Sequence, residues 1–299
     1  MEETVHLLPA ATSLGPVHLI VADLEASLGF YQDLLGFRPA ERTNGRVTFS
    51  ATGSLPAHLI LSAKTGARRR RTAGLYHFAI VLPTRGDLSR ALRHLIETRV
   101  PIEGASDHGV SEALYLHDPE GNGIEIYADR PRVRWPVRGG TLTMGTTALD
   151  VEDLLAQDAG PWEGMPEGTR IGHVHLHVAD LARAEQFYAG VLGFDVTVRG
   201  YPGALFLSAG GYHHHIGLNT WAGTGIAPRD QEDAGLRYFT IFLPDRASTV
   251  TALERIRVAG AALEEAGKEG PAGWLTRDPD GIGVLIASHP FRAARALLQ

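Results

Sequence analysis

The 299-residue chain contains no cysteine, no long hydrophobic run and no excess of basic residues. Without thiols there are no disulfides, no thiolate nucleophile and no cysteine-built zinc or iron–sulfur site, so any metal must be bound by His, Asp or Glu. The longest apolar stretches have only the length of a strand, and no basic segment with a following hydrophobic run opens the chain. We therefore expect neither a membrane span nor a secretory signal, and we expect a cytoplasmic location.

The charge balance disfavours a nucleic-acid partner. The formal net charge is −6, and the one basic run, at residues 68–71, is expected to be a solvated connection. Since 44% of the residues are apolar, the chain can bury a sizeable core, and its length suggests two compact units of about 150 residues each.

The chain contains an internal repeat of four units. The segment GPVHLIVADL at 15–24 returns as GHVHLHVADL at 172–181, so the two halves are duplicates. Within the halves, GLYHFAIVLP at 74–83 matches GLRYFTIFLP at 235–244. Such a repeat constrains the architecture more securely than local propensity does.

Each unit follows the same predicted order of elements. An alternating, β-branched strand such as Val17–Val21 opens it, and a helix follows, over Leu24–Leu35 in the first half and Leu181–Leu192 in the second. Gly36 and Gly193 stand where a left-handed C-terminal cap belongs. Three short strands complete the unit, so the sequence predicts an α+β fold of four βαβββ units.

The composition also marks a boundary between the halves. Residues 131–168 are rich in Pro and Gly, include one short amphipathic stretch near 150–157, and are interpreted as a linker. The predicted domains are therefore residues 1–130 and 169–299.

The sequence resembles the vicinal oxygen chelate superfamily of glyoxalases, bleomycin-resistance proteins and dioxygenases, and is most similar to catechol 2,3-dioxygenase-like extradiol enzymes. The resemblance depends on the four repeats, on DHGVSEALYLHDPEGNGIEIY at 107–127 and on YHHHIGLNTW at 212–221. It implies that two units pair into an open, cup-shaped sheet, with a metal bound in the cup by side chains of first and last strands.

The resemblance predicts a metal site in the N-terminal half. His18, His77 and Glu125 match ligand positions of the family, and two His with one carboxylate are the usual ligands of oxygen-activating Fe(II). Mn(II) would accept the same ligands. A single strand His is more often structural, and the prediction depends on all three together. In the C-terminal half His175 matches His18, but Tyr238 and Leu285 replace the other two, so no metal is expected there.

Three further residues are predicted to serve catalysis. His58 is assigned as the acid/base, because its ordinary pKa of about 6.5 allows proton exchange near neutral pH; the alternative is a surface His in a hairpin. The resemblance implies that Tyr115 and His108 bind the substrate and the intermediate, although His108 also fits an ordinary loop. The run His213–His215 lacks a carboxylate, and alternation puts at most two of its members on one face, so we interpret it as packing or interface rather than a second metal site.

The predicted function is extradiol cleavage of a catechol-type aromatic diol with O2. One alternative is a glyoxalase-type isomerase, which has four protein ligands; Ile60 at the last-strand position of the first unit argues against it. The other is a metal-free binding or resistance protein, which would not need two His and a Glu at ligand positions. Edge strands of open cups often pair across symmetric interfaces, so a homo-oligomer is expected.

Overall fold

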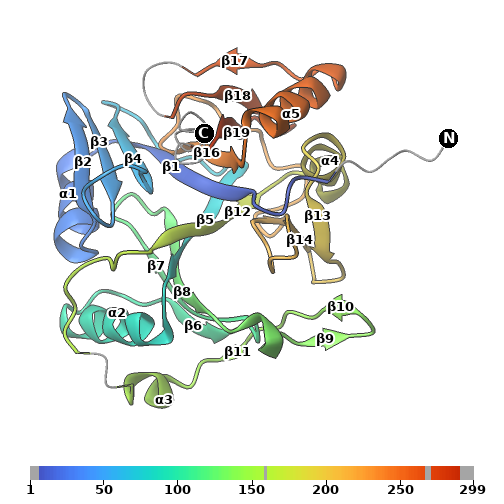
Figure 1. Ribbon diagram of the computed structural model, residues 1–299. Helices are drawn as coiled ribbons and strands as arrows, with labels where there is room; N and C mark the ends of the chain where they lie inside the picture. The colour runs from blue at the N-terminus through green and yellow to red at the C-terminus, as the bar shows by residue number, and fades with distance from the viewer. Residues whose placement is uncertain (1–6, 158–159, 267–270, 290–299) are drawn as a thin grey trace, which may run out of the picture.

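The computed structural model describes residues 7–157, 160–266 and 271–289 and contains four consecutive βαβββ units, as predicted (Figure 1). The first unit consists of β1 (Ser13–Val21), α1 (Leu24–Leu28), η1 (Gly29–Leu34), β2 (Arg38–Thr43), β3 (Arg46–Ser50) and β4 (Leu59–Ala63). The second consists of β5 (Gly74–Leu82), α2 (Arg85–Glu97), β6 (Gly104–Asp107), β7 (Ser111–His117) and β8 (Gly123–Asp129).

The C-terminal half repeats this order. The third unit consists of β12 (Arg170–His177), α4 (Leu181–Glu185), η3 (Gln186–Val191), β13 (Asp195–Val198), β14 (Ala204–Ser208) and β15 (Ile216–Asn219). The fourth consists of β16 (Gly235–Leu243), α5 (Arg246–Val258), β17 (Glu264–Glu265), β18 (Trp274–Arg277) and β19 (Gly283–Ser288).

The helices of the first and third units begin and end as their sequences predict. The Asp23 side chain accepts the backbone N–H of Ala26 and caps α1, and Asp180 caps α4 in the same way. Each α-helix continues as one π-helical turn, η1 or η3. Gly36 and Gly193 follow with φ of 72° and 93°, a conformation that glycine adopts without strain.

The units pair differently from the prediction. Units two and three form one nine-stranded sheet, in the order β11-β6-β7-β8-β5-β12-β15-β14-β13, and units one and four form an eight-stranded sheet, β17-β18-β19-β16-β1-β4-β3-β2. Strand β5 therefore pairs antiparallel with β12, and β1 with β16. Each cup takes one unit from each half of the sequence, so the proposed domains 1–130 and 169–299 do not correspond to the two cups.

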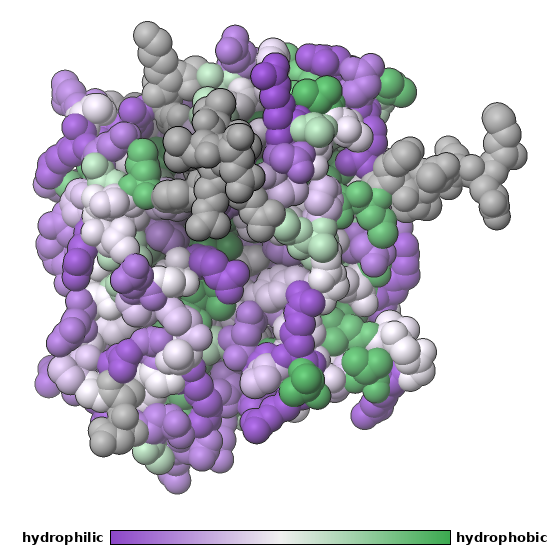
Figure 2. Space-filling view, viewed as in Figure 1, coloured by the Kyte–Doolittle hydropathy of each residue, from purple (hydrophilic) through white to green (hydrophobic). Residues whose placement is uncertain are grey.

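One hydrophobic core runs through both sheets. The side chains that fill it come from all four units, and the helices pack on the sheets from outside (Figure 1). On the face shown in Figure 2, hydrophilic residues cover most of the described surface, and the hydrophobic residues form small separate groups. Within the described residues, no helix has both the length and the apolar character needed to cross a membrane.

The segment between the halves contributes to the nine-stranded sheet. It contains η2 (Arg132–Arg134), the hairpin β9 (Val137–Arg138) and β10 (Thr141–Leu142), β11 (Thr147–Ala148) and α3 (Val151–Leu155). Strand β11 pairs with β6, and α3 lies within the predicted amphipathic stretch. The linker is therefore also a wall of the cup formed by units two and three.

Candidate metal centre

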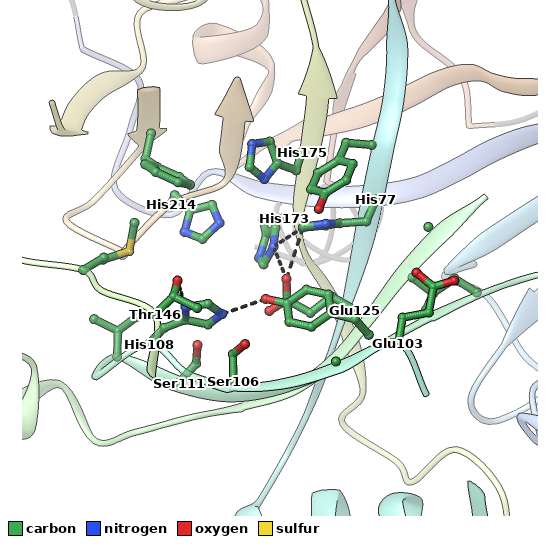
Figure 3. Close-up of a pocket in the computed structure, with 18 of the residues that line it drawn as sticks. His77, Glu103, Ser106, His108, Ser111, Glu125, Thr146, His173, His175 and His214 are labelled. Carbon is green, nitrogen blue, oxygen red and sulfur yellow. Dashed lines mark hydrogen bonds and ion pairs between the residues drawn. The ribbon is translucent and has the colours of Figure 1, made fainter. Parts of the chain in front are cut away.

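Three ligand-type side chains meet inside the nine-stranded sheet (Figure 3). His77 comes from β5, Glu125 from β8 and His173 from β12. Each His Nε2 lies 3.1 Å from Glu125 Oε2, and the two Nε2 atoms are 3.2 Å apart. The pairing of units two and three brings these strands together, since β5 is hydrogen-bonded to both β8 and β12.

The protonation states of these side chains fit a divalent metal ion. All three are buried. Burial lowers the pKa of His173 to about 4, so its imidazole is neutral at pH 7 and has a lone pair for a metal. Burial alone would raise the pKa of Glu125, but His173 and His77 hold it well below its usual value, so the carboxylate is ionised. Two imidazoles and one carboxylate that converge on one point form a metal-binding set.

His18 does not belong to this set, and its assignment as a ligand is corrected. It lies on β1 in the other sheet, where its Nε2 is 2.8 Å from Ser62 Oγ and its ring packs edge-on against Tyr238. The assignment of His18 requires that consecutive units share a cup. Because unit one pairs with unit four, His18 faces Tyr238 rather than His77.

The candidate ligand outside the predicted set is His173. It follows Gly172 in the third unit, and Pro16 occupies the matching position in the first. The sequence does contain a pattern that indicates it. His173, His175 and His177 occupy every second position of β12, so their side chains share one face of the strand. The other sheet has Pro16, Tyr238 and Leu285 at the three matching positions, and because Pro16 and Leu285 have no side-chain donor atom, the three-ligand set is not repeated there.

A cavity of about 380 Å³ opens beside the three side chains and contains two of the predicted catalytic residues. Tyr115 on β7 lies with its hydroxyl 2.6 Å from Nε2 of His108. His108 Nδ1 lies 2.8 Å from the Gly145 carbonyl, which can only accept, so Nδ1 carries a hydrogen. Burial first, and then Glu125, raises the pKa of Tyr115 well above its usual value, so the phenol stays protonated.

His58 lies outside this cavity, and its assignment as the acid/base is corrected. It precedes β4 in the other sheet, and its Nε2 donates to the Thr169 carbonyl at 2.7 Å. Burial lowers its pKa, although the bond to Thr169 opposes that shift. His58 lines a separate cavity that it shares with Tyr212 and His215.

His214 stands in the cavity instead, with its ring centroid 4.0 Å from that of His173 (Figure 3). Its Nδ1 lies 2.8 Å from His213 Nδ1, and His213 Nε2 lies 2.9 Å from Asp129 Oδ1. The prediction for this run applied strand alternation, but β15 begins only at Ile216 and the three His lie in a bend. Alternation therefore does not describe them.

The cavity side of β15 contributes no fourth ligand. Gly217 pairs with His175 there and occupies the position that matches Ile60 of the first unit. A Cβ on Gly217 would lie 2.8 Å from the His175 ring, so the glycine is needed for that histidine to fit. Three protein ligands leave other coordination positions open.

Comparison with known proteins identifies a family model and relatives that this chain resembles. The model of the Glyoxalase/Bleomycin resistance protein/Dioxygenase superfamily matches residues 13–126 and 170–286. Catechol-2,3-dioxygenase of Bacillus subtilis (strain 168) is 47% identical over 262 residues, which cover 85% of this chain and 90% of that protein. Biphenyl-2,3-diol 1,2-dioxygenase 3 of Rhodococcus globerulus is 34% identical over 186 residues, which cover 60% and 83%.

A solved structure supports the fold. Glyoxalase I of Zea mays superposes with a TM-score of 0.58 at 16% identity, covering 96% of this chain and 95% of that one. At this identity the likeness concerns the architecture alone.

Proposed function

Because the chain belongs to the glyoxalase/bleomycin resistance protein/dioxygenase superfamily and is 47% identical to a catechol-2,3-dioxygenase, we propose that it is an extradiol dioxygenase that cleaves a catechol-type diol with O2. The observation that carries this proposal is the convergence of His77, Glu125 and His173 beside a cavity that also contains Tyr115, His108 and His214. Both oxygen atoms of O2 would enter the product, and the ring bond beside the diol would break.

A metal cofactor fits these residues, and Fe(II) is the ion that we propose. His77 and His173 would bind it through nitrogen and Glu125 through oxygen. Iron would supply the one-electron chemistry that dioxygen needs and a Lewis acid for the two diol oxygens, and Mn(II) accepts the same ligands.

Tyr115 and His108 would hold the substrate oxygens. In neutral His108 the hydrogen is on Nδ1, toward Gly145, so Nε2 accepts from the Tyr115 hydroxyl. The phenol oxygen then has a lone pair that can accept from a diol hydroxyl. The hydrogen bond between Tyr115 and His108 fixes the orientation of both side chains without substrate.

His214 would exchange the substrate's proton. The Asp129 carboxylate only accepts, so His213 donates to it from Nε2. When His213 carries its hydrogen on Nε2 alone, its Nδ1 accepts, and His214 donates from its own Nδ1. Burial lowers the pKa of His214 well below its usual value, so the ring is neutral and its Nε2 offers a lone pair to the diol proton.

The glyoxalase alternative requires a fourth protein ligand. Gly217, at the last-strand position of the third unit, has no side chain to supply one. The expected homo-oligomer and the cytoplasmic location remain predictions.

The proposal is tested by loading the protein with Fe(II) anaerobically and then adding catechol and O2. We expect a yellow ring-fission product and the uptake of one O2 per catechol. Resorcinol is the matched control, since its 1,3-diol cannot chelate one metal through both oxygens. The proposal is wrong if none of several catechols is turned over by protein that contains stoichiometric iron.

A further inference from the structure

The part of the cavity formed by the third unit differs in character from the part that holds Tyr115 and His108. From this difference, and on the basis of the proposed function, we infer that the enzyme selects catechols with an uncharged, apolar ring substituent and discriminates against catechols that carry a carboxylate. Three observations support this inference: an aromatic wall, the hydrogen bonds that two of its polar groups already make within the protein, and the charges around the cavity.

The aromatic wall consists of Tyr201, Phe206 and Trp221 from the third unit, with Tyr76 of β5 and Met144 of the linker beside them. Ring centroids lie 5.5 Å apart for Tyr76 and Trp221 and 5.6 Å apart for Tyr201 and Phe206, in edge-to-face arrangements. Trp221 is 45% exposed although it is large and apolar, so part of its face is open to a ligand. Such faces bind alkyl and aryl groups.

Two polar groups of this wall, the Trp221 indole N–H and the Tyr201 hydroxyl, already have partners within the protein. The Trp221 indole N–H donates to the Pro202 carbonyl at 2.9 Å. The Tyr201 hydroxyl lies 3.0 Å from Thr146 Oγ1, which also lies 3.3 Å from His108 Nδ1. A carboxylate placed against Trp221 or Tyr201 would have to break one of these bonds to gain a donor from either ring.

The charges around the cavity are of the wrong sign for an anionic substituent. Among the described residues that line it, none is Lys or Arg, whereas the Glu103 carboxylate does line it, and Glu125 is the carboxylate assigned to the metal. Glu103 pairs with His117 at the edge. Arg130, on the unit-two side, is engaged by Asp107 and Glu112 at 2.8 and 3.0 Å.

A carboxylate on the substrate would therefore lose its hydration without gaining a cation. Burying an unpaired charge is costly, and the cost rises when another carboxylate, here Glu103, is close. An apolar substituent has no such cost and gains from leaving water. The cavity thus separates the two groups of substrates by charge rather than by size.

The test compares two substrates of nearly equal shape, 3,4-dihydroxyphenylacetamide and 3,4-dihydroxyphenylacetate. We expect kcat/KM with Fe(II)-loaded enzyme to be at least about tenfold higher for the neutral amide. Dopamine, a cation, should fall between them. Binding of the amide and of the acetate to the Fe(II)-loaded protein is measured as well, without O2. We expect the amide to bind more tightly than the acetate.

A pair of variants tests the cause. Met144→Lys adds a cation to the wall, so the ratio of the two kcat/KM values should fall by about tenfold, whereas Met144→Leu should leave the ratio unchanged. Equal or better use and binding of the carboxylate by the unmodified enzyme would overturn the inference while leaving the proposed function intact. Failure of every catechol to react would contradict the proposed function, and the binding order would still decide the inference.

Discussion

At the scale of single residues, the chain from Asp129 through His213 to His214 explains why three consecutive His occur in this sequence. Only His214 lines the cavity, and His213 lies behind it on Asp129, which is partly exposed. His215 accepts the backbone N–H of Ala209 and lies outside the cavity. The three side chains therefore have three different roles: a wall of the cavity, a positioning residue and a local backbone contact.

Substituting His213 tests this positioning role. His213→Leu removes the acceptor for His214 Nδ1, and we expect kcat to fall by about 10–100-fold with little change in KM, as for other supporting hydrogen bonds of active sites. In His213→Asn the amide oxygen can accept near the place of Nδ1, so most of kcat should return. Steady-state kinetics of the two variants check this. An equal loss in both would show that His213 contributes packing alone.

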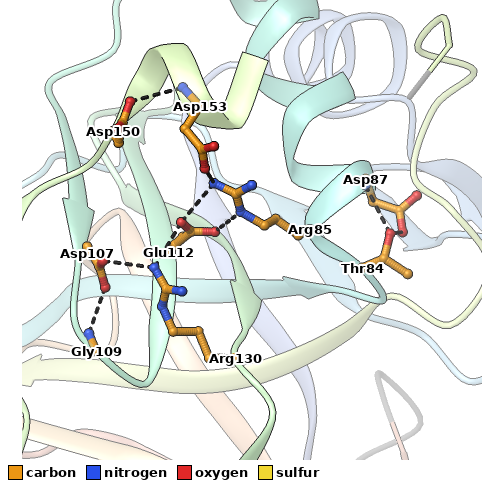
Figure 4. A network of polar contacts seen from close by, with 9 residues as sticks. All are labelled: Thr84, Arg85, Asp87, Asp107, Gly109, Glu112, Arg130, Asp150 and Asp153. Atoms are coloured by element: carbon orange, nitrogen blue, oxygen red, sulfur yellow. Dashed lines mark hydrogen bonds and ion pairs between the residues drawn. The ribbon is translucent and has the colours of Figure 1, made fainter. Parts of the chain in front are cut away.

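At the scale of elements, a polar network around the buried Glu112 carboxylate connects β7 with four other segments of the active sheet and linker (Figure 4). Glu112 on β7 accepts from Arg85 at the start of α2, at 2.5 and 3.1 Å, and from Arg130 after β8 at 3.0 Å. Arg85 also donates to Asp153 of α3 in the linker at 2.6 Å. Arg130 is held further by Asp107 of β6, so the network fixes the linker against the sheet.

Glu112→Gln is expected to destabilise the protein by about 2–4 kcal/mol, because it leaves two arginines without their shared, nearly buried carboxylate. The free energy of unfolding in urea measures this. Glu185→Gln is the matched control, since its partner Arg199 is 63% exposed, and a loss of no more than about 1 kcal/mol is expected there. A cost for Glu112→Gln as small as that of the control would show that the network does not hold the linker.

The elements themselves could be predicted from the sequence because their signals are local. Alternation marks β1 and β12, and Asp at the N-cap with Gly after the last turn marks the helices that follow them. The two-residue strand β11 could not be predicted, because it forms only by pairing with β6. The π-helical turns η1 and η3 likewise have no periodic signal in so short a segment.

At the scale of the whole molecule, the repeat predicts the units but not their partners. Units one and three are copies, as are units two and four, so unit two can present the same kind of strand edge to unit one or to unit three. The structure joins β5 to β12 and β1 to β16. His77, Glu125, Tyr115 and His108 were all found from the sequence because they lie within one unit, whereas the ligand from the partner unit depended on the pairing.

We propose that one metal centre forms between units two and three, with His173 rather than His18 as its third ligand. The most direct measurement is the iron bound per chain, after anaerobic loading and removal of excess metal, in His173→Leu and His18→Leu, with circular dichroism as the check that both fold. The predicted result is less than about a tenth of an equivalent in His173→Leu and close to one equivalent in His18→Leu. Stoichiometric iron in His173→Leu together with its loss from folded His18→Leu would contradict the account.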